Sequence, residues 1–260
     1  VINNFERRYN NTDSNFVREE LNKYLSKQVC GECNGTRLSE GARNVLIEDR
    51  TNTYFYETKP VYLINNESEM IHWSERDGWG HFYRYDSNGN LINRITTGSF
   101  HSFNIKHVDL KSNTLYFSAH GVNKNIDPYY EHTYKVSLNG GKPKVLNNGN
   151  YNTSTQPSDN HKYFVNNFSR VNTVPKSELR NSDGSLVMSL EEADLSELFN
   201  SGYQFPETFK AKAEDGITDL YGVMYKPFNF DDKKKYPLLE YVYPGPQTES
   251  VNKSFSVRMD

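Results

Sequence analysis

The chain has 260 residues, a net charge of −3 and a pI of about 6.2. This near balance of charge excludes a strongly basic protein, so nucleic acid and anionic membranes are not expected as bulk partners. Aromatic residues make up 14% of the chain, with 19 Tyr and 15 Phe, which favours a strand-rich fold. No apolar run is long enough to span a membrane, and no signal-peptide pattern opens the chain.

The first 45 residues differ in pattern from the rest. Thr12 to Ser14 offer an N-cap, and the apolar residues that follow recur at helical spacing, which predicts an amphipathic helix over residues 15–27. Because the chain begins with Val1 rather than methionine, we expect a fragment of a longer protein. The compartment and the oligomeric state cannot be read from this beginning.

The chain's two cysteines, Cys30 and Cys33, follow the predicted helix with a glycine between them. Two thiolates at this spacing form half of a tetrahedral zinc site, which needs four ligands. The alternatives are a site completed by His72 or another histidine, two reduced cysteines in a loop, and a strained or redox-active disulfide. We expect no cofactor in the isolated chain, with zinc bound only if other ligands are supplied.

A β pattern begins at Thr51, with strands predicted over residues 53–57 and 61–64. The clearest pattern follows in SERDGWGHFYRYD, residues 74–86. Trp73 alternates with polar neighbours, Asp77 and Gly78 signal a turn, and aromatic residues then resume at alternate positions. This pattern predicts that residues 71–74 and 82–86 are antiparallel neighbours.

The same turn-and-strand unit recurs along the chain. Its turn glycines, Gly89, Gly140 and Gly184, lie roughly 45 to 50 residues apart, a period typical of four-stranded propeller blades. The alternative is an ordinary antiparallel domain with unrelated hairpins. Further strands are predicted over residues 103–108, 114–118, 131–136, 144–146, 163–168 and 185–190.

The last quarter mixes one helix with strands. The sequence EEADLSELF predicts a short helix over residues 191–199, since its apolar residues share one face below an acidic first turn. Strands over residues 209–213, 220–226 and 238–242 are expected from the family resemblance described next.

Four motifs in order carry a resemblance to a known family: WSERDGWGHFYRYDSNGN, ITTG, AEDGITDLYGVMYKP and KKYPLLEYVYPGPQ. They resemble the dipeptidyl peptidase IV branch of the prolyl oligopeptidase (S9) serine peptidases, over about residues 44–260. The resemblance implies a mainly β fold in which residues 46–200 form a partial β-propeller of about three blades. Residues 201–260 are then the truncated start of an α/β-hydrolase domain.

The resemblance implies a serine peptidase that removes short peptides from N-termini. Such an enzyme needs a G-x-S-x-G serine followed by Asp and His, and this serine pattern is absent from the 260 residues. One functional residue carries over: Tyr243, which matches the family's donor of a hydroxyl to the oxyanion. Its alternative role is a strand-end tyrosine packed on the sheet. We expect the fragment to be inactive as given, with peptide as the substrate of the full-length parent.

Residues 1–45 resemble a segment of UvrA, the DNA-damage recognition ATPase of the excinuclease ABC system, but contain no ATPase motif. The alternative function is therefore a nucleotide-excision-repair fragment that binds zinc, DNA or a partner. Because no linker separates the two resemblances near residues 44–49, we favour a fused or misassembled reading frame, a chimera, over a natural two-domain protein. The peptidase parent would be periplasmic or exported, and the UvrA-like part cytoplasmic.

Overall fold

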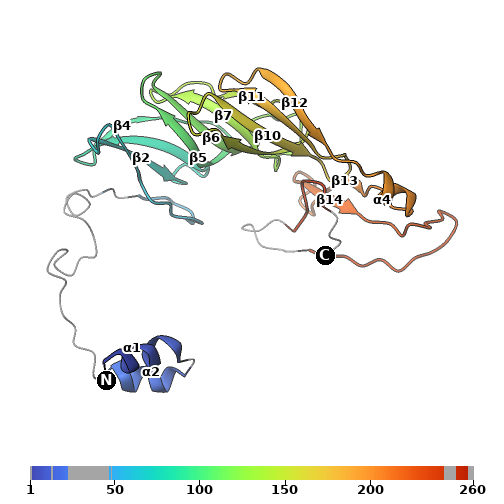
Figure 1. Ribbon diagram of the computed structural model, residues 1–260, viewed down its shortest axis with the longest axis horizontal. Coiled ribbons are helices and arrows are strands. Elements are labelled where there is room, and N and C mark those ends of the chain that lie inside the picture. The colour runs from blue at the N-terminus through green and yellow to red at the C-terminus, as the bar shows by residue number, and fades with distance from the viewer. Residues whose placement is uncertain (1, 13, 23–46, 48, 243–249, 257–260) are drawn as a thin grey trace. The chain divides into compact units, whose positions relative to one another are not determined.

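The computed structural model describes residues 2–12, 14–22, 47, 49–242 and 250–256. It divides into two compact units, Val1–Ile47 and Glu48–Asp260, and each is described by itself (Figure 1). The domain limits predicted from the sequence, at residues 45/46 and 200/201, stay predictions. Among the residues described, no helix has the length and apolar character needed to cross a bilayer.

The described residues of the first unit form two helices, α1 (Ile2–Asn11) and α2 (Asn15–Asn22). Ser14 caps α2, because its hydroxyl accepts a hydrogen bond from the backbone N–H of Val17 at 3.4 Å. The predicted helix is thus confirmed as far as Asn22, and residues 23–27 lie outside the described residues. Helix α1 was not predicted, since its sequence is rich in asparagine, which has a low helix propensity.

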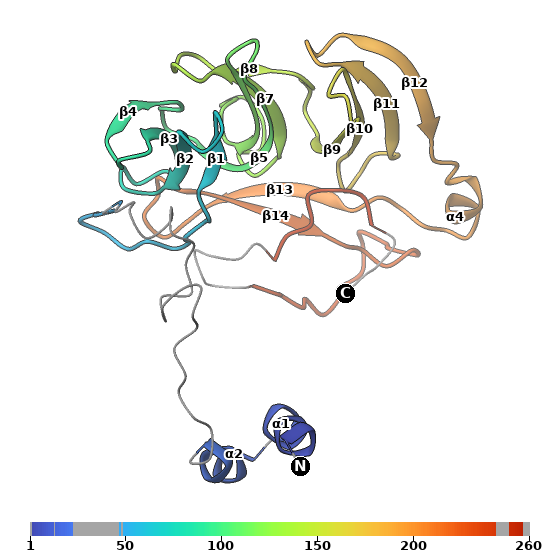
Figure 2. The same ribbon diagram turned by 60° about the vertical axis from the view of Figure 1, so that its left-hand side comes forward.

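The second unit is mainly β. It contains three four-stranded antiparallel sheets, each with its strands in chain order, and one two-stranded hairpin. We call the three sheets sheet 1, sheet 2 and sheet 3; they stand side by side in Figure 2. Sheet 1 consists of β1 (Tyr62–Ile64), β2 (Glu69–Ser74), β3 (His81–Asp86) and β4 (Leu91–Arg94). Sheet 2 consists of β5 (His101–Asp109), β6 (Thr114–His120), β7 (His132–Ser137) and β8 (Lys144–Val145). Sheet 3 consists of β9 (Asn152–Pro157), β10 (Tyr163–Ser169), β11 (Lys176–Asn181) and β12 (Leu186–Glu192).

The predicted hairpin and the predicted repeat are both confirmed. Trp73 on β2 pairs with Phe82 on β3, as the alternation of residues required. Gly89, Gly140 and Gly184 each lie in the turn between the third and fourth strands of their sheets, with φ of 80°, 90° and 93°. This left-handed conformation explains the glycine at each turn, because a Cβ atom is strained there.

The main hydrophobic core lies between sheet 1 and sheet 2. Phe82 of sheet 1 meets Phe117 of sheet 2 edge to face, with 5.7 Å between the ring centroids. The core residues are Ile64, Ile71, Trp73, Phe82, Ile95, Phe100, Leu115, Phe117, Ala119, Tyr134, Val136 and Leu138. Those that lie on strands occupy alternate positions, so sheets 1 and 2 each bury one face against the other, while Ile95, Phe100 and Leu138 come from the connecting segments.

The turn glycines also set how closely neighbouring sheets approach. A Cβ atom built on Gly140 of sheet 2 would lie 2.8 Å from the carbonyl oxygen of Arg94, where the chain leaves sheet 1. A Cβ atom on Gly184 of sheet 3 would lie 2.7 Å from the carbonyl oxygen of Leu146, where the chain leaves sheet 2. Each turn therefore rests directly on the backbone of the preceding sheet.

After sheet 3 come α4 (Ser196–Asn200) and the hairpin of β13 (Glu207–Lys212) and β14 (Asp219–Met224). The hairpin lies across the ends of the sheets in Figure 2. The helix predicted over residues 191–199 is wrong at its start, since Glu191 and Glu192 belong to β12. Pairing with Ser177 and Lys176 on β11 holds these two residues in the sheet, so tertiary context overrides the local helical pattern.

Two predicted strands do not form. Residues 53–57 lack strand pairing because the Glu75 carboxylate accepts the backbone N–H of Tyr56 at 2.7 Å and that of Glu57 at 3.3 Å. These two N–H groups are therefore not free to pair with a neighbouring strand. Residues 238–242 form no strand with any part of the chain that the structure describes, and Leu239 is 94% exposed.

We expect Gly140→Ala and Gly184→Ala to destabilise the protein more than Gly78→Ala. Gly78 has a similar φ of 80°, but a Cβ atom there meets nothing within 4 Å, so its substitution adds only backbone strain of about 1 to 2 kcal/mol. The other two substitutions add a clash with backbone that cannot rotate away. Urea unfolding of the three variants measures the difference, and equal losses would contradict this account of the packing.

Candidate functional site

The residues predicted from the sequence as functional lie outside the described residues. These are Cys30 and Cys33, the predicted half zinc site, and Tyr243, the predicted oxyanion donor. Within the described parts of the chain, no group of three or more His, Cys, Asp or Glu side chains could hold a metal ion. The candidate sites that the structure shows are built instead from histidines, arginines and tyrosines.

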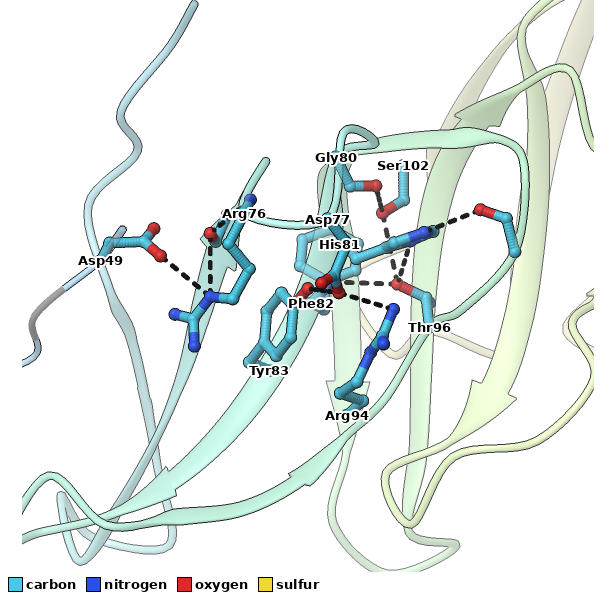
Figure 3. Close-up of polar contacts among 12 residues, drawn as sticks. Asp49, Arg76, Asp77, Gly80, His81, Phe82, Tyr83, Arg94, Thr96 and Ser102 are labelled. Atoms are coloured by element: carbon cyan, nitrogen blue, oxygen red, sulfur yellow. Dashed lines mark hydrogen bonds and ion pairs between the residues drawn. The ribbon is translucent and has the colours of Figure 1, made fainter. Parts of the chain in front are cut away.

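His81 connects the start of β3 to the segment that leads into sheet 2 (Figure 3). Its Nε2 lies 3.0 Å from the carbonyl oxygen of Gly98, and its Nδ1 lies 3.1 Å from the Thr96 hydroxyl. Because a carbonyl only accepts, Nε2 carries the proton and Nδ1 accepts from Thr96. The Thr96 oxygen in turn accepts the backbone N–H of Phe82 at 3.0 Å. We call this arrangement the first histidine latch.

A related arrangement returns 51 residues further along, at the crossing from sheet 2 to sheet 3, although the His132 ring hydrogen-bonds the backbone of Tyr130 in place of a side chain. The Nε2 of His132 lies 3.1 Å from the carbonyl oxygen of Gly149. Asn147 takes the place of Thr96, and its side-chain oxygen accepts the backbone N–H of Thr133 at 2.9 Å. We call this the second histidine latch. An aromatic ring packs against each histidine, Phe100 in the first latch and Tyr151 in the second.

Sequence reasoning missed both latches. The signal was present as a histidine at the start of a predicted strand and a glycine 17 residues later, in the segments ITTG and LNNG. The spacing between the two histidines equals the spacing between Gly89 and Gly140, so the latch belongs to the repeat. Only the structure shows that each ring joins its own strand to the segment that leads into the next sheet.

Burial in the sheets keeps the latch histidines neutral. Desolvation is the largest cause that lowers the pKa of His81 and His132 below the ordinary value, because a buried imidazole is costly to charge. Desolvation, followed by the nearby His101, lowers the pKa of His120 to about 4. A neutral ring is also what the first latch requires, since Nδ1 must accept a hydrogen bond.

A second polar cluster lies beside the first latch (Figure 3). The Tyr83 hydroxyl donates to the Asp77 carboxylate at 2.6 Å, and Arg94 pairs with the same carboxylate at 2.8 Å. The Arg76 guanidinium lies 4.3 Å from the Tyr83 ring centroid and pairs with Asp49 at 2.9 Å. Burial is the largest cause that raises the pKa of Tyr83, so its phenol stays protonated at neutral pH. The negative charges of Asp49 and Asp77 balance the positive charges of Arg76 and Arg94. Through the Asp49–Arg76 pair, the cluster holds residue 49 against sheet 1.

The serines near the end of the described chain include Ser250, Ser254 and Ser256. The Ser254 hydroxyl accepts a hydrogen bond from the Asn152 side-chain amide at 2.9 Å. This contact gives Ser254 a structural role in which it ties the last described segment to the start of β9.

Comparison with known proteins adds two separate likenesses. The family described as dipeptidyl peptidase IV (DPP IV) N-terminal region matches residues 11–175. In contrast, UvrABC system protein A from Xylella fastidiosa (strain Temecula1) is 44% identical over 79 residues, which are 30% of this chain and 8% of that protein. The protein of the same name from Xanthomonas axonopodis pv. citri is 58% identical over 50 residues, 19% of this chain and 5% of that protein. The chain therefore matches less than a tenth of the length of these relatives.

Solved structures share the fold. The crystal structure of Porphyromonas gingivalis dipeptidyl peptidase 4 aligns with a TM-score of 0.61 and 23% identity, over 75% of this chain and 27% of that one. A Bacteroides ovatus protein described as a dipeptidyl aminopeptidase IV aligns with a TM-score of 0.60 and 23% identity, over 76% of this chain and 30% of that one. The chain thus spans under a third of either structure.

We expect the free energy of unfolding to fall as the pH drops from about 6.5 to 4. The unfolded chain protonates its histidines near pH 6.5, whereas the folded chain binds those protons only at lower pH, so acid favours unfolding. Each histidine that stays neutral in the folded chain adds up to about 1.4 kcal/mol per pH unit to the fall in the free energy of unfolding. Carboxylates with a lowered pKa, such as Asp86, act below this window.

Unfolding titrations between pH 8 and 4 test this prediction. His81→Gln and His132→Gln should each be less stable than the parent at pH 8 and show a shallower loss between pH 6.5 and 4. The same slope in parent and variants would show that the latch histidines do not control the acid response.

Proposed function

The chain belongs to the family of dipeptidyl peptidase IV N-terminal regions, and on that premise we propose that it is part of an S9 dipeptidyl peptidase. In this proposal, sheets 1 to 3 are blades of a β-propeller within residues 46–200, and residues 201–260 begin the α/β-hydrolase domain. The repeat carries the proposal: each sheet is a four-stranded meander with a glycine turn at the same place, and turn glycines rest on the preceding sheet.

The β13–β14 hairpin supports the second part of the proposal. It follows α4, shares no strand with the three sheets, and carries exposed apolar residues such as Phe209 and Leu220. The segment at residues 238–242 also exposes apolar side chains, among them Leu238 and Leu239. Apolar strands that expose this much surface need further chain to cover them, as the beginning of a larger sheet does.

The activity of the whole protein is the removal of short peptides from the N-termini of peptide substrates. Tyr243 would donate its hydroxyl to the oxyanion of the tetrahedral intermediate. A donor of this kind is worth roughly 3 to 4 kcal/mol, far less than the barrier reduction of a peptidase. Without a serine nucleophile and its base, the 260 residues alone do not hydrolyse peptides. The parent enzyme is periplasmic or exported in this proposal.

Assays on a Gly-Pro or Ala-Pro chromogenic substrate test this function. We expect no turnover from the 260-residue chain, and turnover from a longer product of the gene that adds a G-x-S-x-G serine with a later Asp and His. In that longer protein, Tyr243→Phe should lower kcat about a hundredfold with the fold intact. Activity of the short chain that survives repurification, or a gene without the serine motif, would overturn the proposal.

A second candidate function concerns residues 1–45 alone. The identity of 58% over 50 residues to a UvrABC system protein A favours a segment that binds zinc, DNA or a repair partner. In this proposal Cys30 and Cys33 supply two of four zinc ligands. The segment would be cytoplasmic, which conflicts with an exported peptidase.

We expect the isolated chain to hold less than stoichiometric zinc, because two thiolates do not complete a tetrahedral site. Elemental analysis of the purified protein, before and after dialysis against a chelator, measures the metal content. One zinc per chain that is lost in Cys30→Ser would contradict this expectation and favour the second candidate.

The two likenesses suggest a chimera joined near residues 44–49. The family match begins at residue 11, ahead of this join. Asp49, at the join itself, pairs with Arg76 in the turn between β2 and β3, so the chain contacts sheet 1 from residue 49 onward. Sequencing of the coding DNA across the join distinguishes the cases: an uninterrupted reading frame in independent isolates would remove the chimera from consideration.

A further inference from the structure

A lysine near the end of the described chain is enclosed by an acid and two tyrosines. The Lys253 Nζ lies 3.0 Å from the Asp127 Oδ2, and the two side chains are only 10% and 16% exposed. The same ammonium lies 4.7 Å from the Tyr129 ring centroid and 5.6 Å from that of Tyr221. The two rings meet edge to face at 6.0 Å, so they form adjoining walls.

The enclosing residues come from distant parts of the sequence. Asp127 and Tyr129 lie in the loop between β6 and β7 of sheet 2, and Tyr221 lies on β14 of the hairpin. Lys253 belongs to the segment 250–256. One ammonium therefore joins a sheet, the hairpin and the end of the described chain.

Neighbouring residues of the same segment dock beside the lysine. Ser254 accepts a hydrogen bond from Asn152 at 2.9 Å, and the backbone N–H of Phe255 donates to the Ser169 hydroxyl at 3.0 Å. The Phe255 ring meets Tyr203 and Phe205 edge to face, at 6.3 Å and 6.0 Å. Two successive residues, Ser254 and Phe255, thus contact the rim of sheet 3 and the crossing that follows it.

Burial distinguishes this ion pair from others on the surface. Exposed pairs contribute little, because water and salt screen them. Lys234 and Asp231 form such a pair, 3.7 Å apart, with side chains 69% and 40% exposed. Around Lys253 the carboxylate and two ring faces replace the lost water, so the loss of one partner leaves a charge poorly compensated.

We propose that Asp127, Tyr129 and Tyr221 form a lysine-binding site that docks residues 250–256 and couples the β13–β14 hairpin to sheet 2. Lys210 is not the lysine that occupies the site, although it lies 5.0 Å from the Tyr221 ring centroid. It pairs instead with Asp219 at 2.6 Å and is 52% exposed. The docked segment follows directly after residues 243–249, so the site anchors the chain just beyond that stretch. The inference does not rest on the proposed peptidase function.

Hydrogen–deuterium exchange on the full chain tests the proposal. In Lys253→Met, which keeps an unbranched side chain one atom shorter and removes its charge, we expect amide exchange in residues 251–255 to speed up at least tenfold. Exchange in β6 and β7 should stay as in the parent. The matched control, Lys234→Met, removes an exposed lysine and should leave residues 251–255 unchanged.

A mutant cycle and a conservative variant complete the test. Asp127→Asn should speed exchange as Lys253→Met does, and the double variant should exchange no faster than the quicker single variant, because both remove one interaction. Lys253→Arg keeps a cation and should retain most of the protection even if Lys253→Met proves unstable. Unchanged exchange in Lys253→Met, additive effects in the double variant, or equal loss in Lys253→Arg would each overturn the lysine site.

Discussion

The close approach of a glycine turn to the backbone of the preceding sheet is the contact on which the rest of the second unit depends. At Gly140 and Gly184 no side chain fits, because carbonyl oxygens of the neighbouring sheet occupy the space that a Cβ atom would need. This approach brings sheet faces near enough for Phe82 and Phe117 to pack, and so creates the core. Since the contact recurs at both crossings, from sheet 1 to sheet 2 and from sheet 2 to sheet 3, the fold grows by repetition rather than around one centre.

Each close approach leaves backbone polar groups at the crossing between sheets, and the histidine latches satisfy them. The carbonyl oxygens of Gly98 and Gly149 would otherwise be poorly paired, and each accepts a hydrogen bond from a buried imidazole. The second latch continues into sheet 3, where Asn147 donates to Asn166 at 2.9 Å. The cost of this solution is sensitivity to acid, because a charged imidazole cannot accept from Thr96 and is expensive to bury.

Sheet 2 has a double role in the chain. It lies in the middle of the row of sheets, and its loop between β6 and β7 also provides Asp127 and Tyr129 to hold Lys253. The part of the chain that we propose to begin a hydrolase domain is thereby tied to the repeat by a few side chains rather than by a shared sheet.

The sequence alone determined the β class, the antiparallel pairing of β2 with β3 and the repeat, because turn glycines and alternating aromatic residues are local signals that sheets of any arrangement must respect. It also indicated the family through motifs. Tertiary structure decided what local pattern could not: Glu191 and Glu192 joined β12 because β11 offered partners, and residues 53–57 lost their pairing to Glu75. The latches and the lysine site likewise join residues that local periodicity cannot connect, since a contact across sheets depends on how whole sheets pack.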